Sequence, residues 1–232
     1  MPNANPNEEK AATLWRNERR RFLEDGVEAH RLLKRINGEG NHLLALEMAE
    51  AILAEKSFDD AVPVQQQMAR ALAILGSSDE ALAVLRGIAP GRTDEAETLG
   101  LLARAWKDLA NSAQDAAEAE RCFRESFECY AKGFEIAVKH NDAGGAAYCG
   151  INAAAVAVLL GERDAARDLA GKAAAYAESD GSYYGIATRA EAALILGKDA
   201  EAESLYRQAS ELGEAGKRWA DIASTRKQCR AL

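Results

Sequence analysis

One spacing constrains the fold of this chain more than any other: a glycine followed five residues later by an alanine. It occurs at Gly40 and Ala45, at Gly76 and Ala81, at Gly161 and Ala166, and at Gly197 and Ala202. The first two glycines are 36 residues apart, and so are the last two. The interval of 85 residues between the two pairs has room for one more unit and 13 inserted residues. Such a period in helical sequence predicts a solenoid of helical hairpins, each turning at its glycine.

The composition also favours helices. Alanine is abundant, only four of the 232 residues are proline, and strand-like runs of valine, isoleucine and threonine are missing. Alanine favours the helix and lets neighbouring helices approach closely. We therefore expect an all-α fold, a right-handed superhelix of about five antiparallel helical hairpins with capping helices.

The register of the glycines predicts where the hairpins lie. We place them near residues 26–56, 62–89, 95–139, 146–178 and 183–213, with the unit at 95–139 the divergent one. A leading helix near 7–24 and a last helix near 215–230 carry apolar stripes around Trp15 and Trp219, which suits capping helices. Residues 7–232 are predicted to form a single domain, and residues 1–6 a disordered tail.

The small residues at the hairpin contacts resemble the tetratricopeptide repeat, in a divergent form that lacks most of its Trp, Tyr and Pro residues. Longer strings resemble the TRAFs-binding domain family, which includes the central regulatory region of the apoptosis signal-regulating kinases and also bacterial proteins. The strings are Glu97-Thr98, Leu102, Arg104, Lys107-Asp108, Phe123 with Phe127, Gly150-Ile151-Asn152 and Leu159-Leu160. The resemblance implies a tetratricopeptide-like array that binds other proteins and regulates an enzyme. The alanine-rich composition indicates a bacterial source, so TRAF binding itself is not carried over.

Charge and hydropathy restrict the partners. The formal net charge of −8 disfavours nucleic acid or an anionic membrane as the main partner. No apolar stretch reaches the roughly 18 residues that would span a membrane, and the first residues lack an apolar signal segment. The run Arg19-Arg20-Arg21 is flanked by acidic residues, so we expect a salt-bridged helix surface there. We expect a cytoplasmic protein.

Catalytic and metal-binding patterns are missing. His30, His42 and His140 have no His or Cys neighbour at ligand spacing. Cys122 and Cys129 are seven residues apart, which is typical of a packed helix face, and we expect reduced cysteines. We therefore predict no enzyme activity, no metal and no cofactor.

The first helix of every hairpin in a tetratricopeptide array lines a concave groove, and this register yields the candidate binding residues. The first three units present a basic and amide-bearing stripe of Arg31, Lys34, Gln66, Gln67, Arg70 and Arg104, with Lys107 one turn on. The later units present Tyr148, Asn152, Tyr184 and Thr188. Such a groove suits an acidic peptide or a C-terminal carboxylate. Alternatively these side chains are solvated or pair with nearby acids, and Arg104 and Lys107 hold the third unit together.

Two function classes fit this pattern. The first is a non-catalytic scaffold or regulatory adaptor that binds another protein or an acidic peptide in its groove. The second is a sensor of the same fold that responds to a small ligand or peptide. The apolar faces of the capping helices are also compatible with a homodimer.

Overall fold

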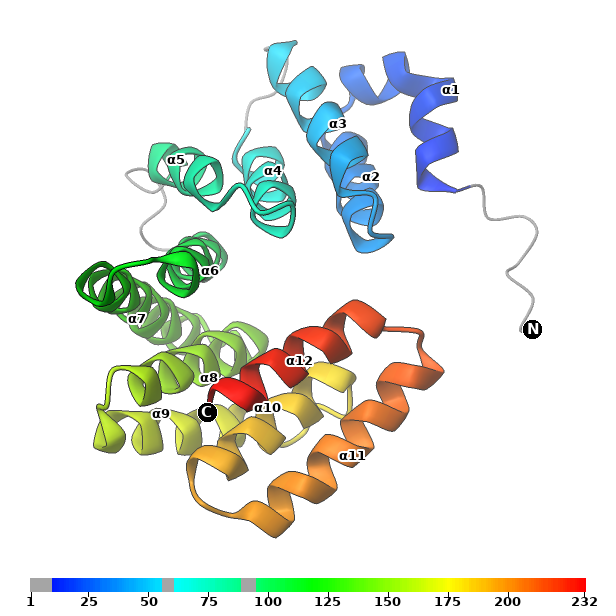
Figure 1. Ribbon diagram of the computed structural model, residues 1–232. Helices are drawn as coiled ribbons and strands as arrows, with labels where there is room; N and C mark the ends of the chain where they lie inside the picture. Colours follow the sequence, from blue (N-terminus) through cyan, green and yellow to red (C-terminus); the bar gives the residue numbers. More distant parts are fainter. Residues whose placement is uncertain (1–9, 56–60, 89–94) are drawn as a thin grey trace. The chain divides into compact units, whose positions relative to one another are not determined.

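A computed structural model describes residues 10–55, 61–88 and 95–232 of the chain (Figure 1). These residues contain twelve α-helices and no strand, so the predicted all-α fold is confirmed. The helices are α1 (Ala11–Glu24), α2 (Gly26–Gly38), α3 (His42–Ala54), α4 (Val62–Ile74), α5 (Ser78–Ile88), α6 (Ala96–Ser112), α7 (Ala116–Lys139), α8 (Ala143–Leu159), α9 (Arg163–Tyr176), α10 (Tyr183–Ile195), α11 (Asp199–Ala215) and α12 (Trp219–Ala231). The predicted disordered tail at residues 1–6 lies outside the described residues.

Helices α2 to α11 pair in chain order as the five predicted hairpins. Four of the five turns contain the repeated glycine, and each adopts a positive φ, from 75° at Gly197 to 91° at Gly76. The residue after each glycine donates its N–H to the carbonyl five residues earlier, as Ser77 does to Leu72 at 2.9 Å. This bond closes the first helix with a Schellman motif, in which the left-handed position favours glycine.

The alanine of the repeat lies at the contact between the two helices of its hairpin. Ala45, Ala81, Ala166 and Ala202 are all buried. A larger side chain at this position would push the paired helices apart, because packed interiors have little free volume.

The divergent third hairpin turns without a glycine. Asp115 caps α7 by accepting a hydrogen bond from the N–H of Ala117. Helix α7 has 24 residues, the longest of the described helices, so the inserted residues of this unit lengthen the hairpin's helices.

The chain divides into two compact units, residues 1–91 and 92–232. In the first, α2 contacts both α3 and α4, and α1 covers α2 and α3. Its core includes Trp15, Leu33, Ile36, Met48 and Ile52, all buried.

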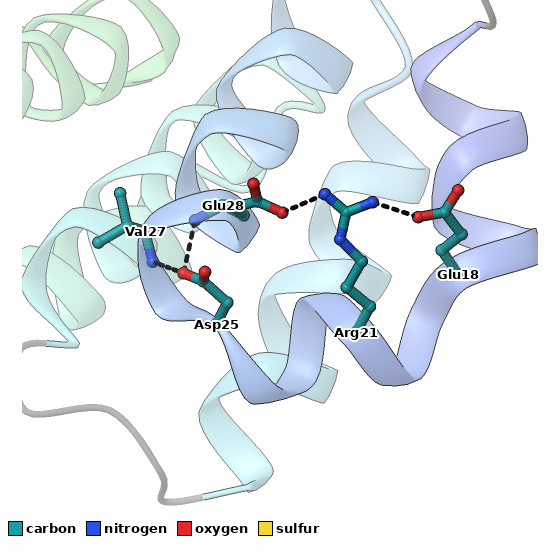
Figure 2. A network of polar contacts seen from close by, with 5 residues as sticks. All are labelled: Glu18, Arg21, Asp25, Val27 and Glu28. Carbon is teal, nitrogen blue, oxygen red and sulfur yellow. Dashed lines mark hydrogen bonds and ion pairs between the residues drawn. The ribbon is translucent and has the colours of Figure 1, made fainter.

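The junction of α1 and α2 is held by charged side chains (Figure 2). Asp25 caps α2 through the N–H groups of Val27 and Glu28, and Arg21 reaches Glu18 on α1 and Glu28 on α2 at 2.6 and 2.7 Å. Arg19 and Arg20 also form ion pairs, with Glu47 and Glu24. The arginine run is therefore the salt-bridged surface that the sequence predicted.

The second unit contains α6 to α12. The helices of its core approach closely because they meet at small residues. A Cβ added to Gly150 of α8, for example, would lie only 3.0 Å from the Phe134 ring of α7. Tyr130 and Cys149 are also buried there. The first helices of the three hairpins are neighbours, since α8 contacts both α6 and α10.

Helix α12 packs on the last hairpin, but with only part of the apolar stripe that the sequence predicted. Only Ile222 is buried, whereas Trp219 is exposed. Its polar side chains instead make hydrogen bonds to α6 and α10.

Candidate partner-binding site

The predicted binding side chains of the second unit gather where α8 lies next to both α6 and α10, and α12 is hydrogen-bonded to α6 and to α10. We call the four residues Lys107, Asn152, Glu191 and Gln228 the polar cluster. Each comes from a different helix: α6, α8, α10 and α12. The cluster therefore exists only when all four helices are in place.

Lys107 is the centre of the polar cluster. Its Nζ donates to Oδ1 of Asn152 and to Oε1 of Gln228, both at 2.9 Å. Asn152 is oriented for this role because its Nδ2 donates to the carbonyl of Tyr148 at 2.9 Å. The amide of Gln228 then bridges the two ionisable residues, since its Nε2 donates to Oε1 of Glu191 at 2.6 Å.

Burial changes the protonation of both ionisable groups in the cluster. It lowers the pKa of Lys107 to about 8, with the positive charges of Arg104 and Lys227 acting in the same direction and Glu191 opposing. Burial likewise raises the pKa of Glu191 to about 7, although the Gln228 hydrogen bond and Lys107 favour its ionised form. Both charges are disfavoured by desolvation, so hydrogen bonds from α12 matter to the cluster.

A second group of contacts, the tyrosine cluster, holds the beginning of α12. The hydroxyls of Tyr183 and Thr225 are hydrogen-bonded at 2.8 Å, and the Tyr184 hydroxyl donates to Asp221 at 2.9 Å. Arg218 donates to the same carboxylate at 2.9 Å and lies 4.5 Å from the centre of the Tyr184 ring. The cation over the ring and the shared carboxylate order the turn before α12.

The structure brings together most of the candidates predicted in this unit. Lys107 and Asn152 belong to the polar cluster, and Tyr184 to the tyrosine cluster. Tyr148 packs edge-to-face on Tyr130, and Arg104 forms an ion pair with Asp108 at 3.7 Å. Thr188 is half-buried, one turn after Tyr184.

The candidates of the first unit divide into exposed cations and buried amides. Arg31 and Lys34 on α2 and Arg70 on α4 are exposed. Gln66 and Gln67 are buried, and the side chain of Asn37 donates to both the carbonyl and the Oε1 of Gln67. Gln67 therefore joins the first two hairpins, because α2 and α4 meet there.

Sequence reasoning missed Glu191 and Gln228 as members of the site. Glu191 occupies the same repeat position as Lys34, Arg70 and Arg104, so the register contained a signal for it. Gln228 has no such signal, because α12 stands outside the repeat.

The described residues offer little for catalysis or metal binding. Within them, no three His, Cys, Asp or Glu side chains cluster where they could hold a metal ion. Burial raises the pKa of the Cys149 thiol to about 12 and that of Cys129 to about 11, which disfavours the nucleophilic thiolate. No helix in the part that the structure describes is long and apolar enough to cross a membrane.

Helical hairpins of this period, turning at glycines and packing through alanines, define a tetratricopeptide-type repeat protein. The chain belongs to the Tetratricopeptide Repeats-Sensor family, whose model matches residues 41–159. The matched region contains Lys107 and Asn152 of the polar cluster. The finer resemblance to the TRAFs-binding domain family stays a prediction, and no curated protein matches the chain.

Solved structures show the same fold. A thermophilic TPR protein of Thermus thermophilus is 21% identical, with a TM-score of 0.68 over 87% of this chain and 98% of its own. A putative kinesin light chain of Podosopora anserina with nearly identical TPR-like repeats is 20% identical, with a TM-score of 0.58 over 91% and 99%. BtubC from P. vanneervenii is 14% identical, with a TM-score of 0.55 over 89% and 87%.

Proposed function

We propose that this chain is a non-catalytic interaction module, a scaffold or regulatory adaptor that binds a segment of another protein on the first helices of its hairpins. One observation carries the proposal: these helices already hold a helix, α12, through side chains at the predicted binding positions. A surface that binds one helix by specific hydrogen bonds is suited to bind another of similar chemistry.

The contacts of α12 indicate what a partner segment must carry. Lys107 takes a side-chain oxygen, Glu191 takes an N–H donor, and Tyr184 takes a carboxylate. In α12, Gln228 supplies the oxygen and the N–H donor, and Asp221 supplies the carboxylate. Asp221 lies seven residues before Gln228, on the same helix face. The partner segment is therefore an acidic, amide-bearing helix that replaces α12.

The first unit contributes a separate acidic-peptide surface to the same function. Arg31, Lys34 and Arg70 remain exposed on α2 and α4. Guanidinium and ammonium groups bind carboxylates by charge-assisted hydrogen bonds. The predicted acidic peptide thus has exposed cationic side chains to bind in this unit.

A sensor is the second candidate, and the way α12 is held favours it. The helix buries only Ile222, and the polar cluster beneath it contains two desolvated ionisable groups. A ligand that binds the uncovered face needs a small free energy to shift α12, because the apolar contribution to its docking is small. The name of the family, Tetratricopeptide Repeats-Sensor, agrees with this candidate.

The test is capture of partners from a lysate of the organism that encodes the chain, with three baits. The wild-type chain is compared with Gln228→Ala/Thr225→Ala, which removes hydrogen bonds that hold α12. The third bait adds Arg104→Glu, a charge reversal on α6 at a side chain whose ion-pair partner, Asp108, lies on the same helix. We expect about tenfold more of one partner on the double variant, since an intramolecular competitor is weakened, and loss of that partner on the triple variant.

The controls separate a specific effect from altered folding or charge. Ser224→Ala changes an exposed residue of α12, and Lys132→Glu reverses an exposed charge on α7. Both should capture the partner as wild type does. A partner held equally by all baits, or none enriched on the double variant, would contradict binding by exchange with α12. A small-molecule fraction that raises the melting temperature of the wild type without a protein partner would favour the sensor.

A further inference from the structure

Helix α12 has a second face that the proposed function does not use. On its first face, the side chains of Asp221, Thr225 and Gln228 form hydrogen bonds with α6 and α10. Trp219, Ala223, Arg226 and Arg230 recur every three to four residues along another side of the helix. Together with Glu214 of α11, this second face lines a cleft of about 440 Å³. We call it the α11–α12 cleft.

The cleft lies beside a close contact between α12 and α11. Gly213 lets Ile222 approach so closely that a Cβ on the glycine would lie 2.8 Å from the Ile222 side chain. At the beginning of α12, by contrast, Trp219 is 61% exposed. The other two tryptophans, Trp15 and Trp106, are only 2% and 5% exposed, so an uncovered indole is an exception in this chain.

The rest of the cleft is basic. Arg226, Lys227 and Arg230 follow Trp219 along α12, and Glu214 is the only acid in the lining. None of these three cations forms an ion pair within the described parts of the chain, whereas Arg218 and Arg207 nearby pair with Asp221 and Glu203. The local positive charge stands out on a chain whose net charge is −8.

We propose that the α11–α12 cleft is a docking site for an acidic segment of another protein that carries an apolar side chain. The apolar side chain packs on Trp219 and Ala223, and the carboxylates pair with Arg226, Lys227 and Arg230. The cleft has the size of an ordinary ligand pocket, and an apolar anchor beside a charged rim is the usual anatomy of a peptide site.

A polyanionic surface fits the cleft less well than a short peptide. Glu214 lies on the opposite wall, and the net negative charge of the chain repels an extended nucleic acid or an anionic membrane. A single short segment is repelled less by Glu214 and by the net charge of the chain, because only the residues that enter the cleft come close to the protein.

The experiment is a selection of random peptides of about twelve residues, displayed on phage, on the full chain. We expect the enriched peptides to contain clustered Asp and Glu next to a Leu, Phe or Trp. Synthetic versions without Trp should change the emission of Trp219, and this change should be missing in Trp219→Phe. Binding should weaken about tenfold in Arg226→Gln/Lys227→Gln/Arg230→Gln, because charge pairs at an exposed rim contribute modestly and together.

The matched control is Lys132→Gln/Lys139→Gln/Arg167→Gln, three exposed cations on α7 and α9. Its binding should equal that of the wild type. The proposal is overturned if the enriched peptides have no acidic bias or bind the two triple variants equally, or if no peptide is enriched. It is also overturned if the Trp219 signal instead follows self-association with rising protein concentration, since a second copy would then occupy the cleft. A peptide that replaced α12 would also change the Trp219 emission, but its binding would not weaken in Arg226→Gln/Lys227→Gln/Arg230→Gln, so this variant separates the two kinds of binding.

Discussion

At the residue scale, Lys107 and Glu191 are the unusual pair, because both ionisable groups lie in a desolvated site without direct contact. Gln228 bridges them, its oxygen facing the cation and its Nε2 facing the acid. A polar network of this kind is favourable only while every member is satisfied. The docking of α12 is therefore coupled to the protonation of two residues on other helices.

The stability of the chain should fall as Glu191 ionises. Its pKa is raised from 4.5 to about 7, so between these values the folded chain keeps a proton that the unfolded chain has lost. Rising pH then favours the unfolded state. Relative to Lys107→Met/Glu191→Gln, which has neither charge, the wild type should lose about 1–3 kcal/mol between the ends of this range.

Urea unfolding at both ends of the range measures this difference. Lys107 acts in the opposite direction at higher pH: its pKa is lowered from 10.5 to about 8, so stability gained from its deprotonation appears above pH 8. A difference between the two proteins that stays constant over this range would show that folding does not raise the pKa of Glu191.

At the scale of elements, α12 differs from the paired helices in how it is held. The hairpin helices pack through rows of buried alanines, as α8 does with ten buried residues. Helix α12 has one buried residue and relies on side-chain hydrogen bonds. Because apolar burial is the larger stabilising contribution in most packed elements, α12 should open more readily than α8.

Gly213 is the position at which this weak docking can be tested. Alanine favours the helix, but at Gly213 its Cβ would meet Ile222 at 2.8 Å and the Tyr183 ring at 3.0 Å. We expect Gly213→Ala to speed hydrogen exchange of the α12 amides about tenfold and to leave α8 unchanged. Gly171→Ala on α9 is the control, because nothing lies within 4 Å of its added Cβ. Equal exchange of α12 in both variants would mean that Ile222 does not anchor this helix.

At the scale of the whole molecule, the chain has two compact units, each with its own buried core. Repeat arrays are stabilised by contacts between neighbouring units, so a defect weakens its own surroundings first. The sequence alone predicts a single domain over residues 7–232 and does not mark this division.

A core substitution in the first unit should act locally. Leu33 is fully buried on α2, and Leu33→Ala should destabilise residues 10–88 by about 2–5 kcal/mol through the cavity it leaves. Hydrogen exchange should quicken in α3 and far less in α8. Leu43→Ala removes the same atoms from an exposed site and should have little effect. Equal loss of protection in both units would support a single cooperative domain instead.

Much of the fold follows from the sequence because its cause is local. A glycine at a left-handed turn and an alanine at a helix contact act within a few residues, and both recur with the period of the hairpin. The register of this period also placed Lys107, Asn152 and Tyr184 on the helices that hold α12. The register did not predict that Gln67 is buried, because it does not show which amide-bearing residues form hydrogen bonds between hairpins.

The amino-acid sequence by itself determined the helices, their pairing and the family of repeats, since short-range periodicity encodes all three. Only the tertiary structure decided where α12 lies, which residues complete the polar cluster, and that a basic cleft remains on the outer side of α12. The physical reason is separation along the chain: Lys107 and Gln228 are 121 residues apart, and Glu191 and Gln228 are 37 apart. No local pattern pairs such residues, because their contact depends on every hairpin folded between them.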